Sequence, residues 1–196
     1  SIQTAISAKA LKIEMFKRFS QDENISSISQ IKSSTQRGIR GCLIEQFPAI
    51  EAIIDDILPK KGNITVAKAS NKISLICRDN EILFFQERDG PIFPTLRLVH
   101  QYPDFMPKMQ VDMGAIKFIL NGSNIMCPGF TSPGGKLEEE IEAGKPVCIM
   151  AEGKVHALAV GITLLSTEEI KTKNKGIGVD TLHFLGDGLW SITKLE

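Results

Sequence analysis

The sequence predicts an α+β fold made of two domains, and three observations indicate it. Apolar residues recur at helical spacing before residue 60, and strand-like runs joined by tight turns follow. After a proline-rich stretch near residue 109, short strands alternate with Gly and Pro turns. A chain of 196 residues can bury two cores of this kind. We expect an N-terminal α+β domain over residues 15–109 and a second domain over 110–196, with residues 1–14 forming a native extension or a remnant of cloning.

The first expected helix lies in SSTQRGIRGCLIEQF. Ser33 and Gln36 have the spacing of a capping box, and apolar residues recur on one face. Gly38 and Gly41 weaken the helix, so the sequence predicts close packing against a neighbour at these positions. Arg37 and Arg40 fall on its polar side, where arginines are more often solubilising charges than RNA ligands.

A second helix is expected in PAIEAIIDDILPKK, begun by Pro48 and ended by Pro59. Three strand-like runs follow, NITVAKA, KISLICR and EILFFQE, and Asp79 and Asn80 are suited to a tight hairpin between the last two. The segment PTLRLVHQYP fits either a short helix or a strand. The N-terminal domain is therefore expected to have its helices first and a small antiparallel sheet after them.

The second domain should begin with a short helix in DMGAIKFILNG, with Asp112 as N-cap and Gly122 just after its end. A short strand, SNIM, follows, and Cys127 to Gly129 predict a second tight turn. Further strands are expected in KPVCIMAE, HALAVGITLL and VDTLHFL. Several short strands around one short helix indicate a small barrel.

Charge and composition exclude several classes of protein. The formal net charge is zero, with +2 over residues 15–109 and −3 over 110–196, so blanket attraction to DNA or RNA is excluded as the main force. Without an apolar run of about 20 residues, no membrane span is expected; the first residues also do not resemble a secretory signal. The scattered cysteines predict buried thiols in an intracellular protein rather than disulfides or a metal site; they are Cys42, Cys77, Cys127 and Cys148.

Catalysis is not expected. The sequence has no nucleophile elbow, Walker loop or dinucleotide fingerprint, and it suggests no cofactor or metal. Cys127 has no histidine in a partnering motif. His183 is expected to pack in the barrel, with Asp187 as a turn former and Trp190 as a core residue.

The stretch IKFILNGSNIMCPGF indicates a cleft suited to a sugar-phosphate strand. Gly122 and Gly129 leave room for close approach, and Lys117 can project beside them. Asn121 and Asn124 add amide donors and acceptors. Taken alone, such glycine caps and turns are more often purely structural.

Longer motifs carry a resemblance to a known family. VDMGAIKFILNGSNIMCPGFTSPG, ALAVG and KGIGVDTLHFLGDGLW resemble a PUA domain, a small RNA-binding pseudobarrel. With MFKRF, LIEQFP, LPKK, LFFQ and PTLRL, residues 15–196 resemble the malignant T-cell-amplified protein family. The resemblance implies an N-terminal pre-PUA domain followed by a PUA domain.

The resemblance also implies a function. Family members are cytoplasmic, non-enzymatic translation factors that pair with the density-regulated protein. They bind the small ribosomal subunit and its rRNA and handle tRNA in ribosome recycling, reinitiation and non-canonical initiation. The family pattern places an RNA-facing edge at six residues of the second domain; these are Lys117, Asn121, Gly122, Met126, Pro128 and Gly129.

Three features outside this edge have more than one interpretation. Lys60 and Lys61 follow a helix end, where a phosphate contact and a simple interaction with the helix dipole are equally expected. Glu138 to Glu142 make a loop more acidic than RNA contact would favour, so a solvated loop is expected there. Ser132 precedes a proline and could accept a phosphate that would weaken RNA binding. A protein-interaction adaptor and an accessory subunit of an RNA-modifying enzyme are the alternatives to a translation factor.

Overall fold

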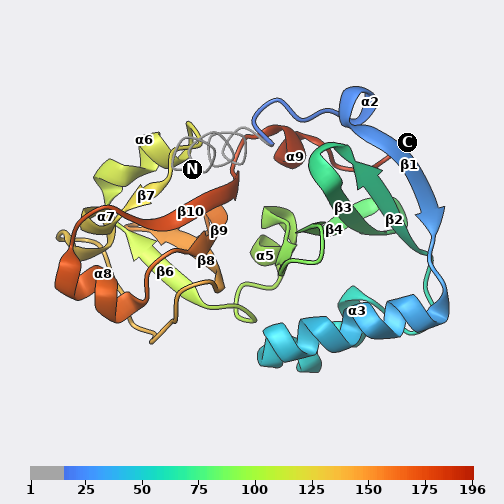
Figure 1. Cartoon of the computed structure of the whole chain (residues 1–196), viewed down its shortest axis with the longest axis horizontal. Helices are drawn as coiled ribbons and strands as arrows, with labels where there is room; N and C mark the ends of the chain where they lie inside the picture. The colour runs from blue at the N-terminus through green and yellow to red at the C-terminus, as the bar shows by residue number, and fades with distance from the viewer. Residues whose placement is uncertain (1–15) are drawn as a thin grey trace, which may run out of the picture. The chain divides into compact units, whose positions relative to one another are not determined.

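The computed structural model describes residues 16–196, which form parts of two compact units (Figure 1). The N-terminal unit comprises Ser20–Met106 together with Ile192–Glu196. The barrel unit comprises, among the described residues, Phe16–Phe19 and Pro107–Ser191. Each unit therefore includes a short segment from the far end of the chain. The predicted extension at residues 1–14 lies outside the described residues.

The N-terminal unit contains a five-stranded antiparallel sheet with its strands in sequence order. Asp79 and Asn80 join two of them with φ of 49° and 68°, as expected of the left-handed hairpin residues predicted there. The three predicted strand runs are confirmed. The strands are β1 (Ile25–Gln30), β2 (Ile64–Ala69), β3 (Ile73–Arg78), β4 (Glu81–Glu87) and β5 (Ile92–Pro94).

The expectation that helices precede the sheet was wrong, because β1 comes before the first long helix. Five of its six residues are exposed, so it shows little of the apolar alternation that reveals a half-buried strand. Strand β5 was also missed, and at three residues it is too short to produce a pattern.

Helix α3 (Ser33–Gln46) forms where it was predicted, but its details differ. Its N-cap is Lys32, and no side chain caps it, so the predicted capping box was wrong. Gln36 instead donates from Nε2 to the Pro59 carbonyl oxygen at 2.5 Å. Nothing lies within 4 Å of a Cβ built on Gly38 or Gly41, so the predicted close packing was wrong as well.

Arg40 is a structural residue rather than a solubilising charge. Its side chain is buried, and the guanidinium donates to the Leu58 and Ile54 carbonyl oxygens. The same guanidinium pairs with Asp55, Nη2 to Oδ1, at 2.6 Å. Arg40 thus ties α3 to the segment that follows it, whereas Arg37 is exposed as expected.

The second predicted helix is broken. The structure has a 3-10 turn, η1 (Pro48–Ala52), then α4 (Ile54–Ile57), with Ile53 at ψ 0° between them. The ambiguous PTLRLVHQYP segment is helical, as α5 (Leu96–Gln101), with the Thr95 hydroxyl capping Leu98 N at 3.4 Å. Two short elements complete the unit, α2 (Gln21–Asn24) and η2 (Ser70–Lys72).

The barrel unit contains a curled five-stranded sheet in the order β6-β8-β9-β10-β7. Strands β6 and β8 run parallel, and the other pairs are antiparallel. Strand β6 was not predicted, because its residues lie in the proline-rich stretch interpreted as a linker. The strands are β6 (Lys108–Val111), β7 (Ile125–Met126), β8 (Pro146–Ala151), β9 (Ala159–Thr163) and β10 (Ile177–Phe184).

Short helices cover this sheet, and the core between them is apolar, including Val147, Ile149 and Val179. Helix α8 was not predicted, although Ser166 and Glu169 form a complete capping box at its start. The helices are η3 (Met113–Ala115), α6 (Ile116–Ile119), α7 (Cys127–Thr131), α8 (Thr167–Lys173) and α9 (Gly188–Ser191). The predicted α+β class with a C-terminal pseudobarrel is confirmed.

The end of the barrel is organised by Asp187. It accepts hydrogen bonds from the backbone N–H groups of Phe184 and Trp190, both at 2.9 Å, and its Oδ2 lies 2.8 Å from His183 Nδ1. His183 and Asp187 are buried and structural, as predicted. Trp190 is only partly buried, and Leu189 beside it is the core residue, so the prediction for Trp190 was wrong.

Candidate nucleic-acid interface

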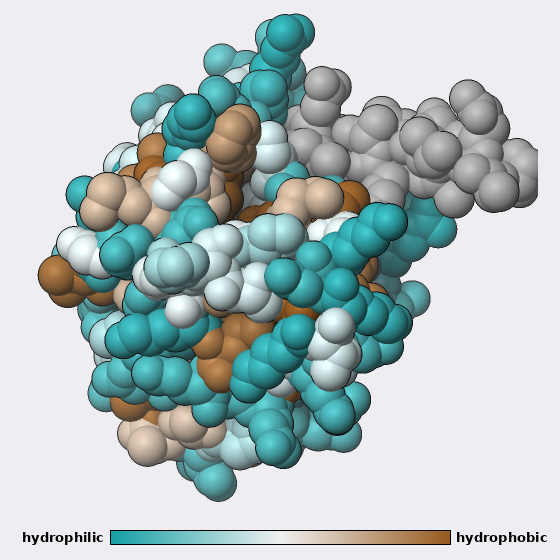
Figure 2. All heavy atoms as spheres, turned by 90° about the vertical axis from the view of Figure 1, so that its left-hand side faces the viewer, coloured by the Kyte–Doolittle hydropathy of each residue, from teal (hydrophilic) through white to brown (hydrophobic). Residues whose placement is uncertain are grey.

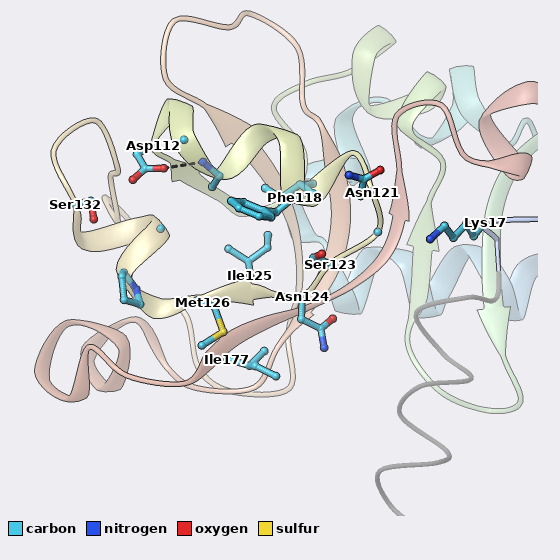
Figure 3. Close-up of a pocket in the computed structure, with 16 residues that line it drawn as sticks. Lys17, Asp112, Phe118, Asn121, Ser123, Asn124, Ile125, Met126, Ser132 and Ile177 are labelled. Carbon is cyan, nitrogen blue, oxygen red and sulfur yellow. Dashed lines mark hydrogen bonds between the residues drawn. The ribbon is translucent and has the colours of Figure 1, made fainter.

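A cleft of about 840 Å³ opens in the barrel unit, between the η3–α6 segment and the β7–α7 segment (Figure 3). Phe118 and Ile125 lie near its centre in this view. Asp112 and Ser132 lie toward one end and Lys17 toward the other. Most lining residues are apolar or glycine, and the polar ones include Asn121, Ser123 and Asn124.

Asp112 holds one wall of the cleft to the other. Its Oδ1 accepts from Ala115 N at 2.9 Å and so caps η3, as predicted. Its own backbone N–H donates to the Gly129 carbonyl oxygen at 2.9 Å. The start of η3 and the helix α7 are therefore fixed relative to each other.

The loop after α6 depends on Gly122. Its φ is 86°, and its N–H donates to the Ile119 carbonyl oxygen at 2.8 Å. A residue with a Cβ would be strained in this conformation. Asn124 then uses its Oδ1 to accept from Thr181 N at 3.1 Å on β10. That oxygen thus positions the loop and is occupied within the fold.

The predicted turn at Cys127 to Gly129 was wrong: these residues begin helix α7. Pro128 stands in the first helical turn, where its missing N–H costs no hydrogen bond. A Cβ built on Gly129 would meet Ile125 and Ala115 at 3.6 and 3.7 Å, which is ordinary contact. Gly129 is also not among the glycines with positive φ, so neither lack of space nor a left-handed backbone requires glycine there.

Large apolar side chains are exposed around the cleft. Phe118 is 56% exposed, Met126 50% and Met113 59%. Lys117 Nζ lies 5.0 Å from the centroid of the Phe118 ring, within cation–π range. Figure 2 shows hydrophobic patches on a mostly hydrophilic face of the molecule. The cleft thus offers an apolar floor, an exposed aromatic ring and nearby positive charge.

Five of the predicted site residues line this cleft; they are Asn121, Gly122, Met126, Pro128 and Gly129. Lys117 is not one of the lining residues, but it directly precedes Phe118, which is, and its Nζ lies over the Phe118 ring. Lys60 and Lys61 belong to the N-terminal unit, where both are exposed just after α4.

Lys17 and Phe118 line the cleft but were not predicted from the sequence. Lys17 lines the cleft although it is about 100 positions away in the chain, and no local pattern could reveal that. Phe118 was missed because an apolar residue in the helix expected across DMGAIKFILNG is ordinarily assigned to the core.

The cysteines offer no reactive group in the cleft. Burial raises the pKa of the Cys127 thiol above its usual value. Burial also raises the pKa of Cys77, to about 12. Cys42 is exposed, contrary to the prediction that all four are buried, because it lies on the outer side of α3.

Among residues 16–196, no group of three or more His, Cys, Asp and Glu residues is arranged to hold a metal ion. No helix in the same range has both the length and the apolar character of a membrane span. In the acidic loop the glutamates are exposed and Ile141 is buried, as expected of a solvated loop anchored by one apolar residue.

Comparison with known proteins identifies both domains. Residues 19–103 match the Pre-PUA-like domain, and residues 107–185 match the PUA domain. A Drosophila melanogaster protein, malignant T-cell-amplified sequence 1 homolog, is 54% identical over 177 residues, covering 90% of this chain and 97% of its own. Malignant T-cell-amplified sequence 2 of Homo sapiens is 48% identical over 176 residues, covering 90% of this chain and 97% of its own.

The chain belongs to the malignant T-cell-amplified sequence family. A solved structure of a hypothetical protein from Pyrococcus horikoshii has a similar fold, with a TM-score of 0.71 and 26% identity, covering 85% of this chain and 99% of that one. Family membership and the PUA domain together support an RNA-binding protein. The cleft lies within the residues that match the PUA domain, apart from Lys17.

Proposed function

We propose that this member of the malignant T-cell-amplified sequence family is a non-enzymatic, cytoplasmic translation factor that binds RNA on the small ribosomal subunit. It would act in reinitiation, recycling or non-canonical initiation and would handle tRNA. The density-regulated protein is its expected partner. The observation that carries the proposal is the cleft in the PUA domain, with exposed Phe118 and Met126 and with Lys17 and Lys117 beside them.

The chemistry of this cleft suits an unpaired nucleotide. An exposed aromatic ring can stack on a base, and such stacking contributes roughly 1–3 kcal/mol per base. Lysines at the edge of the cleft can contact the phosphates on either side. Gly122 is buried and its N–H is bonded to the Ile119 carbonyl oxygen, so it shapes the loop while the exposed Asn121 and Ser123 beside it are accessible to a ligand. The net charge of zero predicts modest affinity for naked RNA, so the ribosomal surface should supply much of the binding energy.

Lys60 and Lys61 are proposed as a second contact with RNA. Both are exposed after α4, and neither makes a close ion pair with a described carboxylate. Two free lysines at one corner suit the phosphate backbone of an rRNA helix. Contacts in both domains would make binding bivalent and therefore tighter than either contact alone.

The test is co-sedimentation with purified small ribosomal subunits, with and without tRNA, over a series of salt concentrations. We expect pelleting that weakens as salt rises. Lys60→Ala/Lys61→Ala should reduce it without tRNA, and Lys117→Ala or Phe118→Ala should reduce the additional binding caused by tRNA. Lys154→Ala, an exposed lysine in the β8–β9 loop, is the matched control. The absence of pelleting at low salt, even with the partner present, would refute the proposal.

One observation favours a second candidate, a protein-interaction adaptor. The exposed Met113, Phe118, Leu120 and Met126 form the kind of apolar surface that binds protein segments. The same experiment separates the two functions. An adaptor should retain its protein partner when Lys117 is replaced, and its binding should resist salt.

A further inference from the structure

Strand β1 leaves an unusual edge on the sheet of the N-terminal unit. It is the first strand in the order β1 to β5, and within residues 16–196 no strand pairs with its outer side (Figure 1). Its sequence, ISSISQ, contains neither a charged residue nor a proline. Sheet edges are ordinarily protected by lysine, proline, strong twist or a covering segment. Among residues 16–196, the device found on this edge is a bulge between Ile25 and Ser27.

The register shows which backbone groups are free on this edge. Ile31 N donates to the Ile64 carbonyl oxygen at 3.2 Å, and Ser29 pairs with Val66 and Ser27 with Lys68 in the same register. Because hydrogen-bonding direction alternates along a strand, Ile28 and Gln30 direct their N–H and C=O groups away from β2. These groups are available to another strand.

The charges at the two ends of β1 define which strand fits. Asp22 and Glu23 lie just before it, and Lys32 lies just after it, and all three are exposed. An antiparallel strand on this edge should therefore have acidic residues before it and a basic residue after it. Strand β1 itself has this arrangement.

We propose that a second copy of this chain pairs with β1, antiparallel about a twofold axis at Ile28. Ile28 then faces Ile28 of the other copy as a hydrogen-bonded pair, and Gln30 faces Ser26. The two Ile28 side chains, each 42% exposed, cover one another on the same face of the sheet. At both ends Lys32 of one copy approaches Asp22 and Glu23 of the other, so the interface is isologous and closed.

The test is sedimentation velocity of the full chain over about a hundredfold range of concentration. A six-residue edge buries little surface, so we expect a weak dimer that appears only toward high concentration and weakens with salt. Ile28→Pro should abolish the dimer, because it removes the outward N–H that would donate to the second copy. The fold should tolerate the change, because the β1–β2 ladder does not use this N–H. Ile28→Lys should also abolish the dimer by placing like charges opposite each other. Circular dichroism would establish that both variants fold.

Matched controls make the assignment specific. Val155→Lys makes the same change of charge at an 82% exposed residue of the barrel unit and should leave dimerisation unchanged. Lys32→Glu should weaken the dimer, and adding Asp22→Lys and Glu23→Lys should restore it. A wild-type chain that stays monomeric throughout, or an Ile28→Pro variant that dimerises normally, would overturn the proposal. Equal loss in Val155→Lys would overturn it too.

Discussion

At the scale of single residues, side chains that maintain the fold can be separated from those proposed to contact RNA. Arg40 and Asp187 each satisfy several backbone groups inside one unit, and neither is exposed enough to act as a ligand. Lys17, Lys117 and Phe118 lie at or beside the cleft and do not have such a structural role. The first group should affect stability when it is changed, and the second group should affect binding.

Arg40→Met tests the structural group. The change keeps the length of the side chain but removes the donors to Leu58 and Ile54, so the buried carbonyls lose their partner. We expect the free energy of unfolding to fall by about 2–3 kcal/mol. Urea unfolding followed by circular dichroism measures it. The exposed Arg37→Ala should change it by less than about 0.5 kcal/mol, and equal effects of the two would contradict the role of Arg40.

The sequence revealed the region of the cleft but only some of its residues. Gly122 was predicted because a left-handed backbone favours glycine, and this preference is local. Lys17 could not be predicted from the sequence, since only the folded chain brings it to the cleft. Arg40 was assigned to a polar face by helical periodicity, which could not anticipate that α4 would cover it.

At the scale of elements, strongly patterned segments were predictable and short ones were not. The β3–β4 hairpin combines apolar strands with an Asp-Asn turn, and it forms as expected. Strand β1 has too little apolar character to be recognised, because its pairing with β2 rather than burial defines it. Helix α7 was missed because proline and glycine indicate a turn as readily as the start of a helix.

Helix α8 provides a prediction about pH at this scale. The Ser166 backbone N–H and then Lys173 lower the pKa of Glu169 below its ordinary value. Ionised Glu169 therefore stabilises the folded helix at neutral pH. This contribution should decline as the pH falls below about 4.3, the pKa of an unfolded glutamate, and through the lower folded value.

Amide hydrogen exchange in α8 across this range of pH is the measurement. Glu169→Gln should flatten the pH dependence of protection, and Glu168→Gln, on an exposed neighbour, should leave it unchanged. Ser166→Ala removes the other half of the capping box and should reduce protection by about 1 kcal/mol at neutral pH. A pH dependence that persists in Glu169→Gln would refute this account.

At the scale of the whole molecule, the two units are not consecutive pieces of the chain. Phe16 accepts a hydrogen bond from Gly188 N at 2.7 Å in the barrel unit. At the other end, Leu195 is buried in the N-terminal unit, and its N–H donates to the Asn80 carbonyl oxygen at 2.8 Å. No periodicity in the sequence could predict that each end of the chain packs in the unit formed by the other end, because this depends on long-range packing of very short segments.

Leu195→Ala tests whether the C-terminal segment stabilises the N-terminal unit. Because Leu195 is only 3% exposed and packs within the N-terminal unit, we expect a loss of about 2–4 kcal/mol in that unit. Hydrogen exchange measured by mass spectrometry should accelerate in β3 and β4, beside Asn80, while β8 and β9 keep their protection. The exposed Lys194→Ala should change neither pair of strands. Faster exchange in β8 and β9 alone would contradict the assignment of the C-terminal segment, since its stabilising contacts would then lie in the barrel unit.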